Sequence, residues 1–149
     1  MTAPPDDADR KHWMGLLARA RPDRLAALMP ADLPRHAFLR APEVGAVMVQ
    51  GRTGAVGAPF NLGEMTVTRC ALRLEDGTVG HAHVQGRDRD HATRAALIDA
   101  LMQGPRALAL RRDVLEVLAA EETARRADRA ARAAATRVEF FTLVRGEDA

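Results

Sequence analysis

The sequence has very little cysteine, lysine and tyrosine, and the shortage of cysteine excludes the most classes of protein. Among 149 residues there is one cysteine, Cys70, so the chain can form neither an internal disulfide nor a metal site made of cysteines alone. A lone thiol is typical of a reducing compartment. No apolar run approaches the ~18 residues that span a bilayer, and residues 1–10 are acidic rather than signal-like. We therefore expect a cytoplasmic protein that makes no contact with a membrane.

Aromatic side chains are also scarce, at 3% of the residues, and tyrosine is absent. The hydrophobic share is nevertheless 47%, so a core has to be built from leucine, valine, alanine and methionine. A chain of this length corresponds to one domain, which can bury roughly 70% of the surface that its unfolded form exposes. We expect a single domain over residues 1–149, with residues 1–8 as a flexible tail.

An excess of charge of one sign is missing too, because the formal net charge is only +2. A nucleic-acid-binding protein normally shows a strong basic excess, so this class is disfavoured. Lys11 is the sole lysine, and every other basic side chain except histidine is arginine. A compositional bias is the simpler explanation. Phosphate recognition is the alternative, because a planar guanidinium can bind phosphate oxygens in a bidentate manner.

The sequence does contain apolar residues at helical spacing, in two segments near the N-terminus and two segments after residue 87. The predicted helices are residues 9–20, 22–29, 88–102 and 110–136. Asp9 is placed to cap the first helix, Pro22 fits the first turn of the second, and Asp88 or Asp90 can cap the third. The last stretch is rich in alanine, arginine and glutamate, which are strong helix formers.

Strand-forming residues lie between these helices and at the C-terminus. A short run around residues 38–39 ends at Pro42, and further strands are predicted at residues 44–49, 65–74, 79–85 and 138–144. Residues 51–63 contain four glycines and a proline and are predicted to be a loop. Together these patterns predict an α+β fold with a mostly antiparallel sheet, in which N-terminal helices and long C-terminal helices pack on one face.

Asp76-Gly77 predicts a tight two-residue hairpin turn between the two central strands. With that turn, Cys70 pairs opposite His83, and period-two alternation places Cys70, His81 and His83 on one face. Three such side chains can hold zinc with one open position, as in a small metalloenzyme. The simpler interpretation is that this face, which also carries leucines, belongs to the core. A one-residue change in the turn would break the cluster.

A possible anion site lies in residues 86–91, between a strand and the start of a helix. Helix N-termini attract anions, and Arg87, Arg89 and His91 could add donors for a phosphate. Ordinary capping by Asp88 explains the same residues equally well. The arginines of the last helix alternate with acidic residues and are expected to form a solvated, salt-bridged face, namely Arg125, Arg126, Arg129 and Arg132.

Several uncommon strings occur in collinear order over nearly the whole chain. They are His12–Met14, Glu43–Gly45, Gly63–Arg69, Leu74–Gly80, Gly86–Asp88, His91-Ala92, Ala96–Gln103 and Thr136–Gly146. With these motifs the chain resembles the G subunit of the bacterial carbon–phosphorus lyase pathway.

The resemblance implies a role in phosphonate catabolism as an accessory subunit of a core complex with the H, I and J subunits and the L protein. That complex transfers an alkylphosphonate to the ribose C1′ of ATP, which is a co-substrate, and adenine leaves. The family assigns no catalytic residue, metal or cofactor to this subunit. Arg87 and His91 lie within the matching motif, and Trp13, Phe140 and Phe141 are candidate partner contacts. A small independent metalloenzyme and a homodimeric small-molecule-binding domain are the competing hypotheses.

Overall fold

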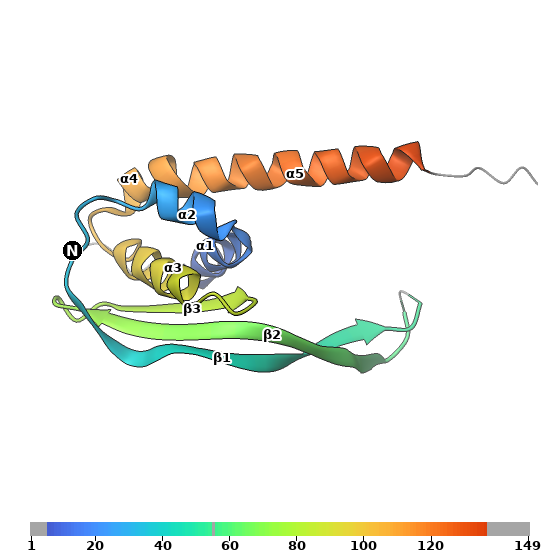
Figure 1. Cartoon of the computed structure of the whole chain (residues 1–149), viewed down its shortest axis with the longest axis horizontal. Coiled ribbons are helices and arrows are strands. Elements are labelled where there is room, and N and C mark those ends of the chain that lie inside the picture. Colours follow the sequence, from blue (N-terminus) through green and yellow to red (C-terminus); the bar gives the residue numbers. More distant parts are fainter. Residues whose placement is uncertain (1–5, 55, 137–149) are drawn as a thin grey trace, which may run out of the picture.

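A computed structural model describes residues 6–54 and 56–136, and it shows a sheet with helices stacked on one face (Figure 1). The elements in chain order are α1 (Asp7–Arg19), α2 (Pro22–Leu28), β1 (His36–Arg52), β2 (Pro59–Leu74), β3 (Val79–Gln85), α3 (Arg89–Leu101), α4 (Ala107–Leu110), a π-helical turn η1 (Arg111–Leu115) and α5 (Glu116–Ala135). The predicted α+β class, with helices before and after the strands, is confirmed.

The helices form two layers over the sheet. Helices α1 and α3 lie directly on the sheet, and α2, α4 and α5 cover them (Figure 1). Nine of the thirteen residues of α3 are buried, because this helix packs between the strands and the outer helices. The core therefore lies between the sheet and the outer helical layer, with α3 at its centre.

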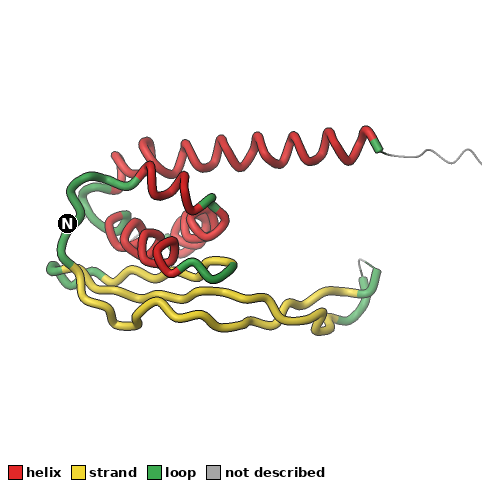
Figure 2. The backbone as a smooth tube through the Cα atoms, viewed as in Figure 1, coloured by secondary structure: helices red, strands yellow, loops and turns green. Residues whose placement is uncertain are grey.

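The sheet is antiparallel with the order β1-β2-β3. Strands β1 and β2 have 17 and 16 residues, whereas β3 has 7. The two long strands consequently continue past β3 and past the inner helices as a bare two-stranded ribbon (Figure 2). We call the part of this ribbon formed by residues 46–64 the hairpin arm.

The predicted loop over residues 51–63 is wrong, because β2 already begins at Pro59 and only residues 53–58 connect the two strands. Cross-strand pairing of Gly51 with Phe60 and of Arg52 with Pro59 overrides the weak strand propensity of this segment. The predicted break at Pro42 is also wrong. β1 runs through this proline as an edge strand, with register shifts on both sides of Arg40, and an edge position tolerates a proline.

The turn between β2 and β3 is one residue longer than predicted. Leu74 donates from its backbone N–H to the carbonyl of Thr78 (2.9 Å), so three residues form the loop, and Gly77 adopts a φ of +90°. Cys70 therefore pairs with Ala82 rather than with His83. This slip moves Cys70 to the helix-covered face and both β3 histidines to the opposite face.

The first residues of α3 and α1 show which of the predicted N-terminal caps are correct. The Asp88 carboxylate accepts from the backbone N–H of His91 (2.8 Å), which confirms Asp88 as the cap of α3. The predicted cap at Asp9 is wrong, because α1 begins at Asp7 and is capped by Asp6. Asp9 instead binds Arg111 (2.6 Å) and so ties α1 to η1. The predicted strand at residues 138–144 lies outside the described residues.

One fully buried carboxylate, that of Asp99, joins α1, β3 and α3. It accepts hydrogen bonds from the Arg10 guanidinium (2.7 and 3.1 Å), the Trp13 indole (2.9 Å) and the backbone N–H of His81 (2.9 Å). All three elements thus meet at one charged, fully hydrogen-bonded point. Trp13, a candidate partner contact from its sequence, is itself 1% exposed and serves the core.

Candidate functional site

A strongly charged hollow lies where the end of α1 meets α5 and the start of α3. Its volume is about 410 Å³. The lining residues are Ala18, Arg19, Ala20, Pro22, Gln85, His91, Glu122, Arg125, Arg126 and Arg129. Four arginines against one carboxylate give this arginine pocket a net charge of about +3, because four positive charges minus one negative charge leave three.

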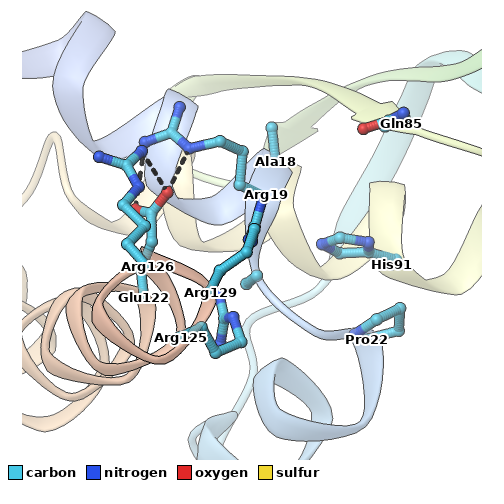
Figure 3. Close-up of a pocket in the computed structure, with 10 residues that line it drawn as sticks. Ala18, Arg19, Pro22, Gln85, His91, Glu122, Arg125, Arg126 and Arg129 are labelled. Carbon is cyan, nitrogen blue, oxygen red and sulfur yellow. Dashed lines mark hydrogen bonds and ion pairs between the residues drawn. The ribbon is translucent and has the colours of Figure 1, made fainter. Parts of the chain in front are cut away.

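Glu122 holds two of these arginines in place. Its carboxylate accepts from Arg19 of α1 (2.7 and 3.3 Å) and from Arg126 of α5 itself (2.7 Å). Figure 3 shows the three side chains gathered at one side of the pocket. The hydrogen bond from Arg19 lowers the pKa of Glu122, so this carboxylate stays ionised at neutral pH. These hydrogen bonds fix α5 against α1 and orient the guanidinium groups of Arg19 and Arg126.

The other two arginines of the pocket have no such partner. Within the described residues no carboxylate lies within 4.0 Å of the guanidinium of Arg125 or of Arg129. They are four positions apart on α5, so they share one face of the helix. Arg132, one turn further along, is paired with Asp128 (2.9 Å) and does not line the pocket. Arg125 and Arg129 thus line the hollow without an ion pair to any described carboxylate.

The opposite wall of the pocket is formed by Gln85 and His91 (Figure 3). His91 is 2% exposed, and its Nε2 lies 2.8 Å from the carbonyl oxygen of Leu17. A carbonyl can only accept, so Nε2 donates and carries the proton. This bond positions the start of α3 against α1. The lining thus offers guanidinium groups and an amide as donors, a set suited to binding an anion.

Comparison with known proteins identifies the family. The sequence model described as "Phosphonate metabolism protein PhnG" matches residues 8–146. The chain belongs to the PhnG family. It is also similar to the "Alpha-D-ribose 1-methylphosphonate 5-triphosphate synthase subunit PhnG" of Rhizobium meliloti (strain 1021). The two are 46% identical over 143 residues, which is 95% of this chain and 92% of the relative. The resemblance that the collinear motifs indicated is confirmed.

In this PhnG-family chain the predicted site at residues 86–91 is only partly assembled. Arg87 and Arg89 are exposed, and their side chains do not line the arginine pocket. His91 reaches the pocket but is buried against α1. Asp88 caps α3, as the simpler interpretation required. The structure therefore separates the buried His91 from the two exposed arginines.

The hypothetical zinc cluster of this PhnG-family chain does not form. Cys70 is buried beneath the helices, whereas the side chains of His81 and His83 are exposed on the other face. In residues 6–54 and 56–136 no three histidine, cysteine or acidic side chains are placed to hold a metal ion. Partial burial and the nearby charge of Arg69 lower the pKa of His83, so the uncharged imidazole is favoured.

Sequence reasoning missed the arginine pocket because it unites segments far apart in the chain. The run of arginines in α5 was visible, but its partner Arg19 is 103 residues away from Glu122. A signal was nevertheless present, since Arg129 has no acidic residue three or four positions before or after it. Phe140 and Phe141 lie outside the described residues. No described helix has both the length and the apolar character that a membrane crossing requires.

Proposed function

We propose that the chain is an accessory, structural subunit of the complex that makes ribose 1-methylphosphonate 5-triphosphate. In this complex the phosphonate attacks the ribose C1′ of ATP, adenine leaves, and the H, I and J subunits and the L protein are the partners. The proposal rests on membership of the PhnG family and on the subunit named in the relative. We further propose that the complex is cytoplasmic.

The observation that carries a subunit role is the hairpin arm together with the strand that forms it. None of the seventeen residues of β1 is buried, although apolar side chains are frequent along it. Large apolar side chains are exposed on β1 and β2, namely Phe38, Leu39, Met48, Phe60 and Leu62. A monomer rarely leaves so long an apolar ribbon in water, so this surface fits burial against another subunit.

Helix α5 supports the same role. It has 20 residues, and Leu118 is the one that is buried. A surface helix normally turns an apolar stripe toward its own core, but most of α5 extends past the inner helices (Figure 1). Its small alanine side chains permit a close approach by a partner.

The contribution to the reaction that we propose is indirect. In the proposed reaction the phosphonate is the nucleophile, so no nucleophilic side chain is required of this chain. We propose that the partner subunits supply the catalytic residues, and that this chain holds them in place and adds the positive charge of the arginine pocket near a phosphate-bearing substrate.

Co-expression with the cognate I and H subunits tests the proposal, read by size-exclusion chromatography with mass analysis. We expect the chain to elute in a stable complex of defined mass with both subunits. A chain that remains a monomer or a homodimer in the presence of both subunits would contradict the proposal and favour the small-molecule-binding alternative.

A pair of variants locates the contact. Phe60→Ser combined with Leu62→Ser removes two exposed apolar groups of the hairpin arm and should reduce co-purification strongly without unfolding the core. Leu108→Ser is the matched control, because Leu108 is 83% exposed but lies on α4. If both variants retain the partners equally, the hairpin arm is not the interface.

Arg87 and Arg89 remain proposed contacts to a partner or to a phosphate group. Both side chains are exposed, Arg87 in the link between β3 and α3 and Arg89 at the first position of α3. Arg87→Ala should lower the synthase activity of the reconstituted complex while leaving the unfolding midpoint unchanged. Full activity of that complex would remove Arg87 from the site.

A further inference from the structure

We propose that the arginine pocket binds the polyphosphate chain of a phosphorylated ligand. The choice of a polyphosphate, rather than of another anion, rests on the proposed function, because the reaction's nucleotide and its product both carry a triphosphate. Anion binding itself is argued from the pocket.

The first argument is the balance of charge. The pocket gathers guanidinium groups from α1 and α5, and Glu122 is the one carboxylate among the described residues that line it. Glu121 lies outside the lining and interacts with Arg125 through its charge alone. Arg125 and Arg129 lie at i and i+4 on one helix, where like charges repel and destabilise the helix. An anion between them converts this repulsion into two attractive contacts. The arrangement is therefore unfavourable when the pocket is empty and favourable when a multiply charged anion occupies it.

The second argument is preorganisation. Glu122 binds Arg19 and Arg126 with hydrogen bonds of 2.7 Å, so their guanidinium groups are already fixed before a ligand arrives. Arg24 of α2 binds Glu121, the neighbour of Glu122, at 2.6 Å and adds a second tie between α5 and the N-terminal helices. A site whose walls are held by ion pairs loses little conformational entropy when an anion binds.

The third argument concerns the shape and polarity of the lining. A volume of about 410 Å³ falls within the range of roughly 300–1,000 Å³ that is usual for small-molecule sites. The apolar part of the wall consists of alanine and proline side chains, with no phenylalanine, tyrosine or tryptophan on which a nucleobase could stack. The recognised group is then a compact polyanion rather than a base. Arginine's planar fork suits successive phosphate groups.

The test is a calorimetric titration of the full-length chain with inorganic tripolyphosphate at low salt, repeated with ATP and with inorganic phosphate. We expect tripolyphosphate and ATP to bind with similar affinity, inorganic phosphate to bind at least tenfold more weakly, and all binding to weaken as salt screens the charges. Arg125→Gln and Arg129→Gln should each weaken tripolyphosphate binding by about tenfold or more, because each removes charge-assisted hydrogen bonds.

Arg132→Gln on the same helix is the matched control, because it removes one positive charge outside the pocket and should leave the affinity within about twofold. Circular dichroism of each variant verifies that α5 remains helical. An equal loss of affinity in Arg132→Gln and Arg129→Gln, or unchanged binding in the double variant Arg125→Gln with Arg129→Gln, would overturn the proposal. ATP binding without tripolyphosphate binding would do the same, because recognition would then depend on the nucleoside.

An acidic segment of a partner subunit is the rival occupant, and the assembled complex distinguishes it. If the complex no longer binds tripolyphosphate and the double variant no longer assembles, the pocket docks a protein and the polyphosphate proposal is wrong. The titration of the isolated chain is independent of assembly. A chain that binds tripolyphosphate but never joins the I and H subunits would therefore refute the proposed function while leaving the pocket's anion specificity intact.

Discussion

Helices α3 and α5 differ in how many of their residues the rest of the molecule buries. In α3 nine of thirteen residues are buried, whereas in α5 one of twenty is. Both helices are alanine-rich, so composition does not explain the difference. α3 packs between the sheet and the outer helices, and α5 touches its own fold mainly through η1 and α1.

The strands repeat this contrast. The helix-facing residues of β2 near its C-terminal end are buried, while β1 has no buried residue along its whole length. The region around α3 and the C-terminal end of β2 is therefore stabilised by contacts within the chain, and we call it the self-contained region. Strand β1 and helix α5 expose most of their side chains to solvent, and we call them the surface-presenting region. Substitutions in the first region should change stability, and substitutions in the second should change binding. The predictions below test this division.

The largest effect is expected at Asp99, where the self-contained region has its buried charge. Asp99→Ala leaves the Arg10 guanidinium, the Trp13 indole and a backbone N–H without their acceptor. Breaking a buried pair costs about 3–5 kcal/mol, and we expect the lower end because Arg10 is 28% exposed. Urea unfolding followed by the fluorescence of Trp13, the sole tryptophan, measures the change.

Asp128→Ala is the control for this measurement. It also removes the acceptor of an arginine, but the pair Asp128–Arg132 lies exposed on α5. The expected loss is below about 1 kcal/mol. Similar losses in the two variants would mean that the buried and exposed regions do not differ as described.

A second effect is expected where β3 packs directly on α3. A side chain at Gly80 would overlap the carbonyl oxygen of Ala96 and lie 2.8 Å from the backbone nitrogen of Ala100. Gly80→Ala should therefore destabilise the fold by about 1–3 kcal/mol, through overpacking against backbone that has no room to move. Thermal unfolding by circular dichroism measures it.

Gly104→Ala is the matched substitution, because the new Cβ would meet only the carbonyl oxygen of Leu101 at 3.8 Å. It should change the stability by less than about 0.5 kcal/mol. A stable Gly80→Ala variant would show that β3 and α3 are not in direct backbone contact.

The self-contained region was also the part that the sequence predicted best. The periodicity of residues 88–102 and the capping Asp88 predict α3 almost to its ends, because helix geometry and capping are local. The register of the β2–β3 turn was missed by one residue, because an Asp-Gly pair fits both a two-residue and a three-residue loop. That one residue decided that Cys70 and the β3 histidines lie on opposite faces.

The surface-presenting region was predicted less well, for a different physical reason. Glycines and Pro59 indicated a loop over residues 51–63, but pairing between distant residues such as Gly51 and Phe60 extends both strands. The arginine pocket likewise depends on Arg19 meeting Glu122. Contacts across so many residues leave no periodic trace in the sequence, so local patterns show the arginines of α5 but not the pocket that they line.

A third prediction concerns the acid sensitivity of α5. Hydrogen bonds from Arg24 and Arg19 lower the pKa values of Glu121 and Glu122 in the folded chain. Because these values lie below the unfolded one, the pairs contribute stability above the ordinary glutamate pKa of about 4.3, and this contribution is lost as pH falls through the lowered values. The urea midpoint should therefore fall with acidification.

The double variant Glu121→Gln with Glu122→Gln isolates this contribution. It should be less stable than the wild type at neutral pH and should lose less stability in acid, so that the two midpoints converge once the pH falls below the lowered pKa values. Parallel curves at all pH values would show that the ion pairs do not hold α5 against α1 and α2.

The smallest change compares the two regions by the rate at which a single thiol in each reacts with a labelling reagent. Burial raises the pKa of Cys70, which is 2% exposed, so both access and thiolate content are low at neutral pH. A thiol reagent should therefore label Cys70 only when the core opens. Met48→Cys places a second thiol on the hairpin arm, where Met48 is 52% exposed. The new thiol should react roughly a hundredfold faster or more, since its labelling requires no opening. Equal rates in the native chain would mean that the core opens as readily as the arm, and the division into a self-contained and a surface-presenting region would fail.

Addition of the I and H subunits sharpens the test, because a partner seated on the hairpin arm should slow the labelling of residue 48 while Cys70 stays protected throughout.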